Sequence, residues 1–454
     1  MDPVRRIAII GSGPSGFYAA GHLLKAFGDG CTVDMFDRLP TPHGLVRSGV
    51  APDHPKIKSV TRVYDKTAGH ASFRFFGNVT FGTDVTHDEL AARYNAIIYA
   101  VGTPDGRLLG IPGEELHGSW AATDFVGWYN GHPDHAGHDF DLSVKRAVVI
   151  GNGNVAIDVA RMLMLDAAEL TETDTADYAL QALRASAVEE VVVVGRRGPA
   201  EAAFTNPELL ELGELAAADV VIEPAGCADA AELPEETTAR RNVEILRELA
   251  RRPPSGKPRR IVLRFLASPT EIHGDEKGRV RAVTLEQNEL VADESGTVRA
   301  RPSGVTERLE AGLALQAIGY RGAQLPGVPF DPHSGVIPTR ESRVVGEDGQ
   351  PILGEYAVGW VKRGPSGVIG TNKKCAQETV DALLEDLAAG RLLDPEPQTD
   401  EQLEAFVAER QEHHVPYAGW EAIDRHERER GEADGRPRVK LTLVEQMLDV
   451  ARGR

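Results

Sequence analysis

The stretch that decides the fold is Arg6–Phe27, RIAIIGSGPSGFYAAGHLLKAF, in which an apolar run is followed by a glycine-rich turn and a helical pattern. Ile7–Ile10 is typical of a strand buried on both faces of a parallel sheet. Phe17–Phe27 repeats its apolar residues at helical spacing. The same order of strand, turn and helix recurs in Arg146–Met164, RAVVIGNGNVAIDVARMLM. The recurrence predicts an α/β protein with two Rossmann-like dinucleotide-binding domains.

Two further strands end in glycine and mark where the chain is expected to pass between these domains. They are Ala96–Thr103 (AIIYAVGT) and Leu313–Tyr320 (LALQAIGY). After the second, the sequence returns to a strand, a glycine-rich turn and a helix that would complete the first domain. We therefore expect the second domain to be inserted into the first, with residues 1–103 and 331–454 in the first domain and its C-terminal tail, and 104–330 in the second.

Bulk composition excludes several classes of protein. The 454 residues are 41% hydrophobic and 26% charged, and no apolar run reaches the roughly 18 residues that a membrane helix needs. A net charge of −19 argues against non-specific nucleic-acid binding. The three cysteines, Cys31, Cys227 and Cys375, are far apart and form no CxxC pair, so neither a disulfide framework nor a dithiol centre is expected. A cytoplasmic protein without membrane or nucleic-acid partners fits these features.

The first glycine-rich turn has the residues of a dinucleotide site. Gly11 permits a tight turn, Gly13 lets backbone amides approach a pyrophosphate, and Gly16 allows the helix to pack on the strand. The N-terminus of that helix then faces the phosphates. Asp37 follows Gly16 by 21 positions, at the end of the next strand, where it can accept hydrogen bonds from ribose hydroxyls. A purely structural glycine turn is the alternative.

The second turn, GNGNVA, places Gly151 and Gly153 in the same roles and Ala156 at the third position. At the end of its next strand stand Arg196 and Arg197, where an acidic residue would select an unmodified ribose. Guanidinium groups bind phosphate oxygens through paired hydrogen bonds, so these residues favour the 2′-phosphate of NADP over NAD. A pair of solvated surface arginines is the alternative.

Two such motifs in one chain indicate one cofactor that is kept and one that is exchanged, a flavin and a nicotinamide. Glu208 lies soon after the arginines and is a candidate contact for the adenosine end of the nicotinamide cofactor, or an ordinary surface residue. The sequence shows no metal-ligand set, no Ser/His/Asp spacing and no kinase-type phosphate loop. Hydride chemistry carried by the cofactors is therefore the reaction class that remains.

With these motifs, the chain resembles the adrenodoxin-reductase-like ferredoxin–NADP reductases, especially the mycobacterial type, over essentially its whole length. Two departures stand out: Asp37 where the family more often has Glu, and His43 in place of a bulky aromatic residue. The matching segments are GSGPSGFYAA, LPTPHGLVRSGVAPDHPKIKSV, FRFFGNV, AVVIGNGNVAIDVAR, VVVVGRRGP and GWVKRGPSGVIGTNKK.

The resemblance implies specific cofactor contacts. A helix opening after GPSGVIG would present free amides and a positive dipole end that stabilise charge on a reduced flavin. The residues implied for FAD are Ser15, Asp37, Leu45, Val79, Trp360, Gly367, Val368 and Ile369, and those implied for NADP are Arg107, Asn154, Val155, Arg196, Arg197, Glu208 and Gly367.

The resemblance also implies two groups near the reacting rings, His54 and Asp158. A histidine titrates near neutrality, and a neighbouring carboxylate would orient it or keep it charged. We interpret them as tuning groups, because hydride transfer needs no protein acid or base. A structural His–Asp pair is the alternative.

The partner implied by the resemblance is a ferredoxin. Since no iron–sulfur ligand set is present, the ferredoxin would be a separate protein. Nine basic residues against two acidic ones lie between Arg240 and Arg264, and they resemble the basic helix with which the family docks its acidic partner. A solvated helix face is the alternative. The docking candidates are Arg240, Arg241, Arg247 and Arg251.

The sequence thus predicts an FAD-dependent ferredoxin–NADP reductase, with an NADP domain inserted into an FAD domain. Hydride would pass from NADPH to FAD and single electrons to the ferredoxin, reversibly. A flavin-dependent monooxygenase on the same scaffold and a non-catalytic FAD-binding redox sensor are the alternatives.

Overall fold

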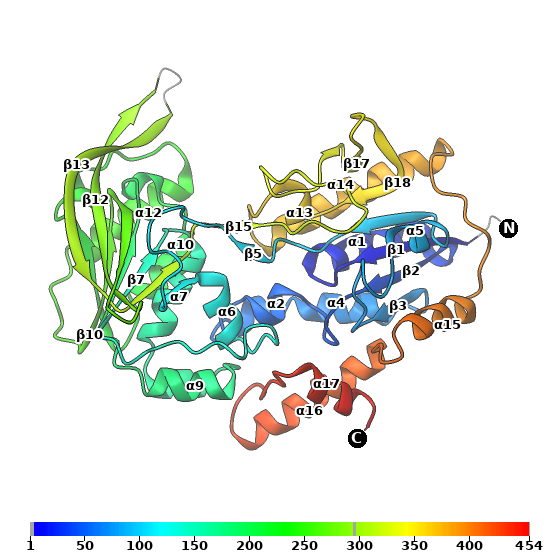
Figure 1. Cartoon of the computed structure of the whole chain (residues 1–454), viewed down its shortest axis with the longest axis horizontal. Helices are drawn as coiled ribbons and strands as arrows, with labels where there is room; N and C mark the ends of the chain where they lie inside the picture. The colour runs from blue at the N-terminus through cyan, green and yellow to red at the C-terminus, as the bar shows by residue number, and fades with distance from the viewer. Residues whose placement is uncertain (1–3, 294–296, 454) are drawn as a thin grey trace. The chain divides into compact units, whose positions relative to one another are not determined.

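The computed structural model describes residues 4–293 and 297–453, which form two compact units (Figure 1). Unit 1 comprises Met1–Asp105 and Tyr320–Arg454, and unit 2 is Gly106–Gly319. Strands β5 (Asp105–Gly106) and β15 (Tyr320–Arg321) pair where the chain passes between the units. Residues 320–330, expected in the inserted domain, belong to unit 1, because the chain crosses directly after Gly319.

Unit 1 is built on a seven-stranded sheet in the order β16-β17-β18-β4-β1-β2-β3. Neighbouring strands from β18 to β3 pair in parallel, whereas β17 pairs antiparallel with both β16 and β18. Alternate residues of β1 contribute to two different cores: Ile7 and Ile9 to one, Ala8 and Ile10 to the other. The strands are β1 (Arg5–Ile10), β2 (Cys31–Phe36), β3 (Phe73–Phe76), β4 (Ala96–Tyr99), β16 (Thr339–Arg340), β17 (Arg343–Val345) and β18 (Pro351–Ala357).

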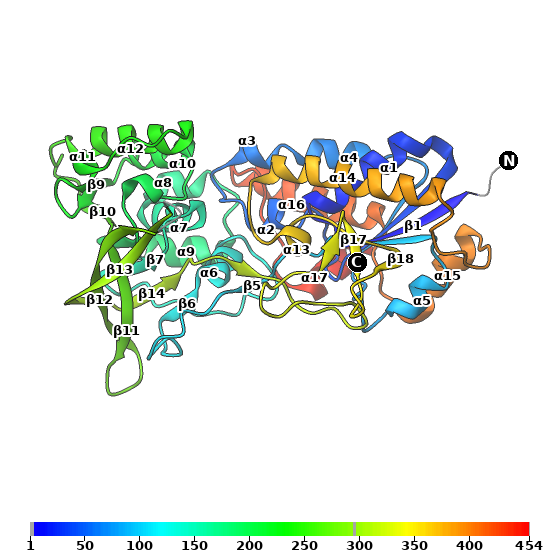
Figure 2. The same ribbon diagram turned by 90° about the horizontal axis from the view of Figure 1, so that it is seen from above.

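Helices cover both faces of this sheet. Helices α1 and α14 lie side by side on one face (Figure 2), and Leu90 and Phe406 bring α5 and α15 onto the other. The helices of unit 1 are α1 (Pro14–Phe27), α2 (Leu45–Ser48), α3 (Pro55–Lys58), α4 (Thr61–Ala68), α5 (His87–Ala91), α13 (Trp360–Arg363), α14 (Ile369–Ala388), α15 (Asp400–Arg410), α16 (Tyr417–Ala433) and α17 (Val444–Ala451), with a 3₁₀ turn at Gly28–Gly30.

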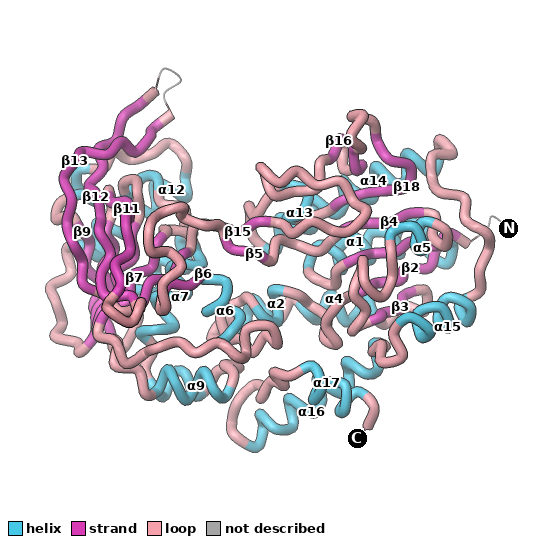
Figure 3. Tube along the Cα trace, in the orientation of Figure 1, coloured by secondary structure: helices cyan, strands magenta, loops and turns pink. Residues whose placement is uncertain are grey.

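Unit 2 is built on a six-stranded parallel sheet in the order β6-β14-β7-β8-β10-β9. A three-stranded antiparallel sheet contributes residues such as Ile272 and Val283 to the core that it shares with one face of the parallel sheet (Figure 3). The strands are β6 (Ser119–Ala121), β7 (Arg146–Ile150), β8 (Glu190–Val194), β9 (Ala218–Glu223), β10 (Arg259–Arg264) and β14 (Leu313–Gln316) in the first sheet, and β11 (Ala267–Gly274), β12 (Val280–Ala292) and β13 (Val298–Glu310) in the second.

The other face of the parallel sheet is covered by helices. Val191 and Val193 of β8 pack into this helical core, while Val192 and Val194 face the small sheet. The β-branched run therefore fills both faces, as expected for a central parallel strand. The helices are α6 (Ala122–Tyr129), α7 (Asn154–Met164), α8 (Ala167–Thr171), α9 (Asp177–Arg184), α10 (Asn206–Leu212), α11 (Cys227–Ala230) and α12 (Thr237–Ala250), with a 3₁₀ turn at Pro199–Glu201.

The C-terminal tail packs against the segment that follows β2. Trp420 is buried, and its ring meets the His43 ring edge-on at 5.5 Å. The Arg47 guanidinium lies over Trp420 and donates to the buried carboxylate of Glu427, which also accepts from Arg438 at 3.0 Å. Burial opposes ionisation of Glu427, but the two arginines hold its pKa below the ordinary value. The tail therefore fixes the segment around His43 and Arg47.

The predicted α/β class, with one Rossmann-like domain inserted into another, is confirmed. No helix in the described ranges combines the length and apolar character required to cross a bilayer.

Candidate functional site

In unit 1 the first glycine-rich turn is crowded at two positions and open at the third. A Cβ on Gly11, where φ is +106°, would lie 2.6 Å from the Ala100 carbonyl oxygen, and one on Gly16 would lie 2.2 Å from the Gly11 oxygen. Around a Cβ on Gly13 there is nothing within 4 Å. The fold itself requires Gly11 and Gly16, whereas Gly13 leaves space beside the N-terminus of α1. That space fits a pyrophosphate.

The Asp37 side chain is held at the end of β2. Its carboxylate accepts hydrogen bonds from the backbone N–H of Ser12 (3.0 Å), the Ser12 hydroxyl (2.5 Å) and the N–H of Leu39 (3.0 Å). The N–H of buried Val79 donates to the Asp37 carbonyl oxygen at 2.9 Å. Asp37 and Val79, both predicted FAD contacts, thus lie together next to the turn.

The segment after β2 lies across the glycine-rich turn. The His43 N–H donates to the Ser12 carbonyl oxygen at 3.0 Å, and a Cβ on Gly44 would be 2.9 Å from the Gly13 Cα. Leu45 then begins α2 with 42% of its surface exposed. The structure therefore brings Leu45 beside the open position at Gly13.

A hydrogen bond joins the N-terminal turns of α1 and α14. The buried Ser15 hydroxyl donates to Asn372 Oδ1 at 3.0 Å. A Cβ on Gly359 would lie 2.0 Å from Ser15 Oγ, so only glycine fits between β18 and α1. Two helix N-termini, each with a positive dipole end, therefore approach the same part of unit 1.

The other predicted FAD residues line the start of α14. Trp360 Nε1 donates to the Ser366 carbonyl oxygen at 3.2 Å. Gly367 has φ +81°, Val368 is 56% exposed, and Ile369 is the first residue of α14. The backbone that opens this helix is accessible in unit 1.

Arg363, which is not among the residues predicted from the sequence, lies beside these residues. Its Nη2 donates to Asn372 Oδ1 at 3.0 Å. Its Nε and Nη1 are buried and have no hydrogen-bond partner among the described residues. Buried charged donors are costly unless paired, so the site suits an anionic group. A basic residue directly before GPSG was the available signal.

In unit 2 the second turn repeats the pattern of the first. A Cβ on Gly151, where φ is +128°, would lie 2.2 Å from the Ala317 carbonyl oxygen, while nothing lies within 4 Å of one on Gly153. Ala156 is fully buried against the strands, as its place at the third motif position requires. Gly153 therefore leaves space at the N-terminus of α7.

The end of β8 carries the two arginines. Arg196 is exposed and Arg197 partly exposed, and neither guanidinium has a hydrogen bond or ion pair within the described ranges. Asn154 and Val155 are the first residues of α7, and Asn154 Oδ1 accepts from the Thr205 N–H at 2.8 Å. These side chains suit a phosphate group and a dinucleotide at the end of the strand.

The other residues predicted to contact NADP or to lie near the reacting rings make hydrogen bonds within the protein or lie in different units. Glu208 accepts a hydrogen bond from the Thr205 hydroxyl at the start of α10. Arg107 is exposed, and its backbone N–H donates to the Gly319 carbonyl oxygen at 3.0 Å. Asp158 accepts from Arg161 at 2.9 Å on its own helix. His54 precedes α3 in unit 1 and Asp158 is in unit 2, so their predicted pairing stays a prediction.

Tertiary contacts engage much of the basic segment around α12. Arg241 pairs with Glu244, and Arg251 with Asp229. Arg247 donates to carbonyl oxygens of Ala228 and Ala231, which ties α12 to the α11 region. Arg240 and Arg241 remain exposed on α12. The linear count of charges therefore overstates the positive charge of this surface.

The chain has two domains that each contain a strand, a glycine-rich turn and a helix, and one domain is inserted in the other. This arrangement defines the class of oxidoreductases that bind two dinucleotides. Residues 5–197 match the family model described as pyridine nucleotide-disulphide oxidoreductase. The chain is 52% identical to NADPH-ferredoxin reductase FprA of Mycobacterium leprae, over 99% of each chain. It is 39% identical to the mitochondrial NADPH:adrenodoxin oxidoreductase of Arabidopsis thaliana, over 98% of this chain and 95% of that protein.

A solved structure of a related protein has the same fold. Mycobacterium tuberculosis FprA in complex with NADPH has a TM-score of 0.94 to this chain at 50% identity, with 99% of this chain and 100% of that one covered. The chain belongs to the NADPH-ferredoxin reductase family. The resemblance found in the sequence is confirmed.

Proposed function

We propose that this chain is an FAD-dependent reductase that transfers electrons between NADPH and a separate ferredoxin. The observation that carries the proposal is the paired geometry of the two turns, each open at its middle glycine beside a helix N-terminus. When bound, FAD would supply the chemistry that links a two-electron hydride from NADPH to single-electron transfer to the iron–sulfur protein. Full-length similarity to named NADPH-ferredoxin reductases supports this reaction.

Unit 1 is the FAD domain in this proposal. Gly11, Gly13 and Gly16 shape the pyrophosphate turn, and Asp37 accepts from the ribose of FAD. The hydrogen bond between Ser15 and Asn372 supports this role, because it holds the two helix N-termini in one place. The other residues proposed to contact FAD are Leu45, Val79, Trp360, Gly367, Val368 and Ile369.

Unit 2 is the NADP domain. Arg196 and Arg197 bind the 2′-phosphate, which the absence of other partners for their guanidinium groups within the described residues supports. Because NAD lacks that phosphate, the two arginines select NADPH over NADH. The other residues proposed to contact NADP are Arg107, Gly151, Gly153, Asn154, Val155 and Glu208, together with Gly367 of unit 1.

His54 and Asp158 are proposed to act beside the reacting rings without exchanging protons with substrate. The carboxylate of Asp158 is oriented by Arg161 at 2.9 Å, which supports a fixed position for it. His54 would adjust the polarity around the flavin.

Ferredoxin is proposed to dock on the basic surface formed by Arg240, Arg241, Arg247 and Arg251. Arg240 supports this role best, because it is exposed and its guanidinium donates only to the Pro234 carbonyl oxygen among the described residues. The ion pairs of Arg241 and Arg251 reduce their share of the attraction. Three unpaired cysteines are consistent with a reducing cytoplasm.

The test is steady-state NADPH oxidation by the purified holoenzyme, with and without a small acidic ferredoxin, read through reduction of cytochrome c. We expect turnover that requires ferredoxin, prefers NADPH to NADH and weakens as salt is raised. The Arg240→Glu variant should weaken ferredoxin-dependent turnover and leave reduction of a small uncharged acceptor unchanged.

NADPH oxidation that ignores ferredoxin but is coupled to an organic substrate would favour the monooxygenase alternative instead. Binding of both cofactors with no turnover toward any acceptor would favour the redox sensor.

A further inference from the structure

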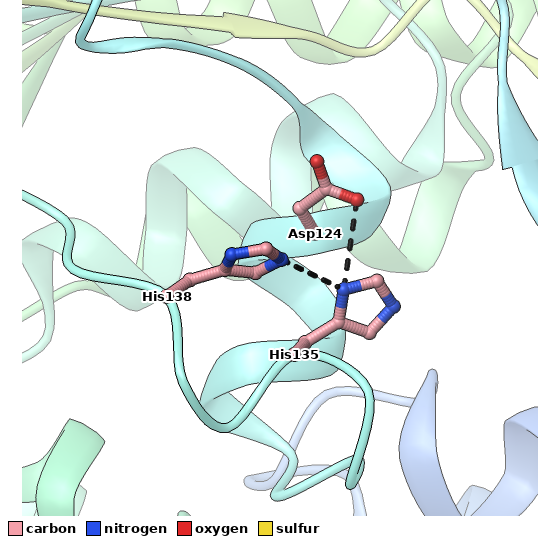
Figure 4. Close-up of side chains that lie close together, drawn as sticks. All are labelled: Asp124, His135 and His138. Carbon is pink, nitrogen blue, oxygen red and sulfur yellow. Dashed lines mark hydrogen bonds and ion pairs between the residues drawn. The ribbon is translucent and has the colours of Figure 1, made fainter.

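Three side chains of unit 2 converge outside the dinucleotide turn (Figure 4). Asp124 projects from α6, and His135 and His138 come from the loop that follows this helix. His135 Nδ1 lies 3.3 Å from His138 Nε2 and 3.6 Å from Asp124 Oδ1. One ligand atom from each residue lies within 4.8 Å of the other two.

The fold holds the two histidines in place. A Cβ on Gly127 would lie 2.3 Å from His135 Cδ2, so the imidazole rests against the backbone of α6 where only glycine leaves room. Backbone hydrogen bonds from the N–H of His135 to the His132 oxygen (3.0 Å) and from that of His138 to the His135 oxygen (3.1 Å) make successive turns. The His138 ring packs 5.0 Å from that of Trp120.

The two distances from His135 Nδ1 match the edges of a coordination tetrahedron. With metal–ligand bonds of about 2.0–2.2 Å, two donors of a tetrahedral Zn²⁺ lie roughly 3.3–3.6 Å apart. The two distances from His135 Nδ1 fall in that interval. Two imidazoles and one carboxylate are also ligands that Zn²⁺ commonly accepts, with water in the fourth position.

We propose that Asp124, His135 and His138 form a zinc site that pins the loop after α6 to that helix. The proposal revises the prediction of no metal-ligand set. Its signal was the spacing His132-x-x-His135-x-x-His138, but Asp124 could be added only from the tertiary structure. The Nδ1 of His132 already accepts the Asp134 N–H at 3.2 Å, so His132 is not included. The site needs neither FAD nor NADPH and is independent of the proposed function.

The experiment uses untagged holoenzyme stripped with EDTA and titrated with ZnCl₂ in a calorimeter. We expect one site per chain. Because loss of an outer partner of a metal ligand already costs about 10–100-fold in affinity, His135→Gln and His138→Gln should weaken binding by more than about 100-fold. The matched control is His117→Gln, which changes an exposed histidine of the same unit and should leave binding unchanged.

X-ray absorption at the zinc edge identifies the donors. We expect nitrogen and oxygen at about 2.0–2.2 Å and no sulfur at about 2.3 Å. FAD content and circular dichroism confirm that each variant is folded, and Asp124→Asn offers a nearly isosteric change if a histidine variant is not. The proposal is overturned if wild-type protein takes up no zinc, if the folded ligand variants bind as wild type does, or if a sulfur shell appears.

Discussion

The two glycine-rich turns share one backbone design and differ in what surrounds it. Around the first, Ser12, Ser15 and Gly16 are buried, while every residue of Gly151–Val155 in the second keeps part of its surface exposed. The strand after the first turn ends in a carboxylate that accepts three hydrogen bonds. The strand after the second ends in two guanidinium groups with no partner among the described residues.

This difference separates what the fold demands from what each ligand demands. Gly11 and Gly151 both have positive φ and both face a carbonyl oxygen, so the backbone alone explains them. The segment around His43 and the start of α14 enclose only the first turn within its unit. An enclosed site suits a cofactor that stays bound, and an open site suits one that exchanges.

The largest expected effect comes from replacing the equivalent glycines. Gly11→Ala and Gly151→Ala each force a Cβ against a carbonyl oxygen at 2.6 and 2.2 Å and hold alanine at positive φ. The left-handed conformation costs about 1–2 kcal/mol and overpacking about 1–3 kcal/mol, and relief of this strain displaces the turn whose backbone amides face the pyrophosphate. We expect Gly11→Ala to purify without FAD, and Gly151→Ala to keep FAD and lose NADPH.

FAD absorbance per protein and NADPH titration of each variant check this reciprocity. Gly13→Ala and Gly153→Ala are the matched controls, because nothing of the protein lies near either Cβ. They should keep wild-type thermal stability without ligand and weaken only the cofactor of their own turn. If Gly151→Ala lost FAD as readily as Gly11→Ala, the two cofactor sites would not be independent.

A smaller effect is expected at the arginines that distinguish the second turn. Hydrogen bonds to charged groups are worth about 1.5–3 kcal/mol each. Because both arginines are partly or fully exposed, we expect values near the lower end of this range for them. The double variant Arg196→Ala/Arg197→Ala should therefore raise the KM for NADPH by about 100-fold while the KM for NADH changes little. Arg308→Ala, an exposed arginine in the same unit, is the control. Equal increases for both nucleotides would show that the arginines do not recognise the 2′-phosphate.

Local patterns sufficed to predict the turns because each lies within one strand–turn–helix segment. Ile7–Ile10 and Arg146–Ile150 are buried parallel strands as expected, and the chain crosses between units within three residues of Gly102 and at Gly319. What depends on distant partners was not visible in the sequence. Arg363 acquires its place only when Asn372 folds back toward it.

The basic segment around α12 also depends on distant partners that the sequence does not show. Its count of positive charges was correct, but Asp229 is far from Arg251 in sequence and neutralises it in space. The zinc site likewise combines a loop pattern with Asp124 on a helix. Sequence spacing predicts elements and their ends, whereas charge balance and ligand sets require the tertiary structure.

The smallest effect concerns His43, whose segment encloses the first turn. Burial, followed by the charges of Arg47, Arg438 and Arg428, lowers the pKa of His43 from an ordinary 6.5 to about 3. Asp65, half exposed and 3.5 Å from His43 Nε2, opposes this shift, but solvent screens it and burial dominates. His43 is therefore neutral in the folded protein at every pH well above 3.

The unfolded chain takes up a proton at His43 below pH 6.5 and the folded chain does not, so stability must fall as pH decreases from 6.5 toward 3. The contribution approaches about 1.4 kcal/mol per pH unit. His43→Phe cannot be protonated and should flatten the acid side of the pH–stability curve, whereas exposed His413→Gln should not. Thermal unfolding and FAD release between pH 6.5 and 4.5 measure both. The His43 N–H donates to the Ser12 carbonyl oxygen at 3.0 Å. FAD release with the same pH dependence as thermal unfolding would therefore show that this segment holds the first cofactor in place. If His43→Phe had the same pH dependence of stability as the wild type, the acid sensitivity would belong to other groups.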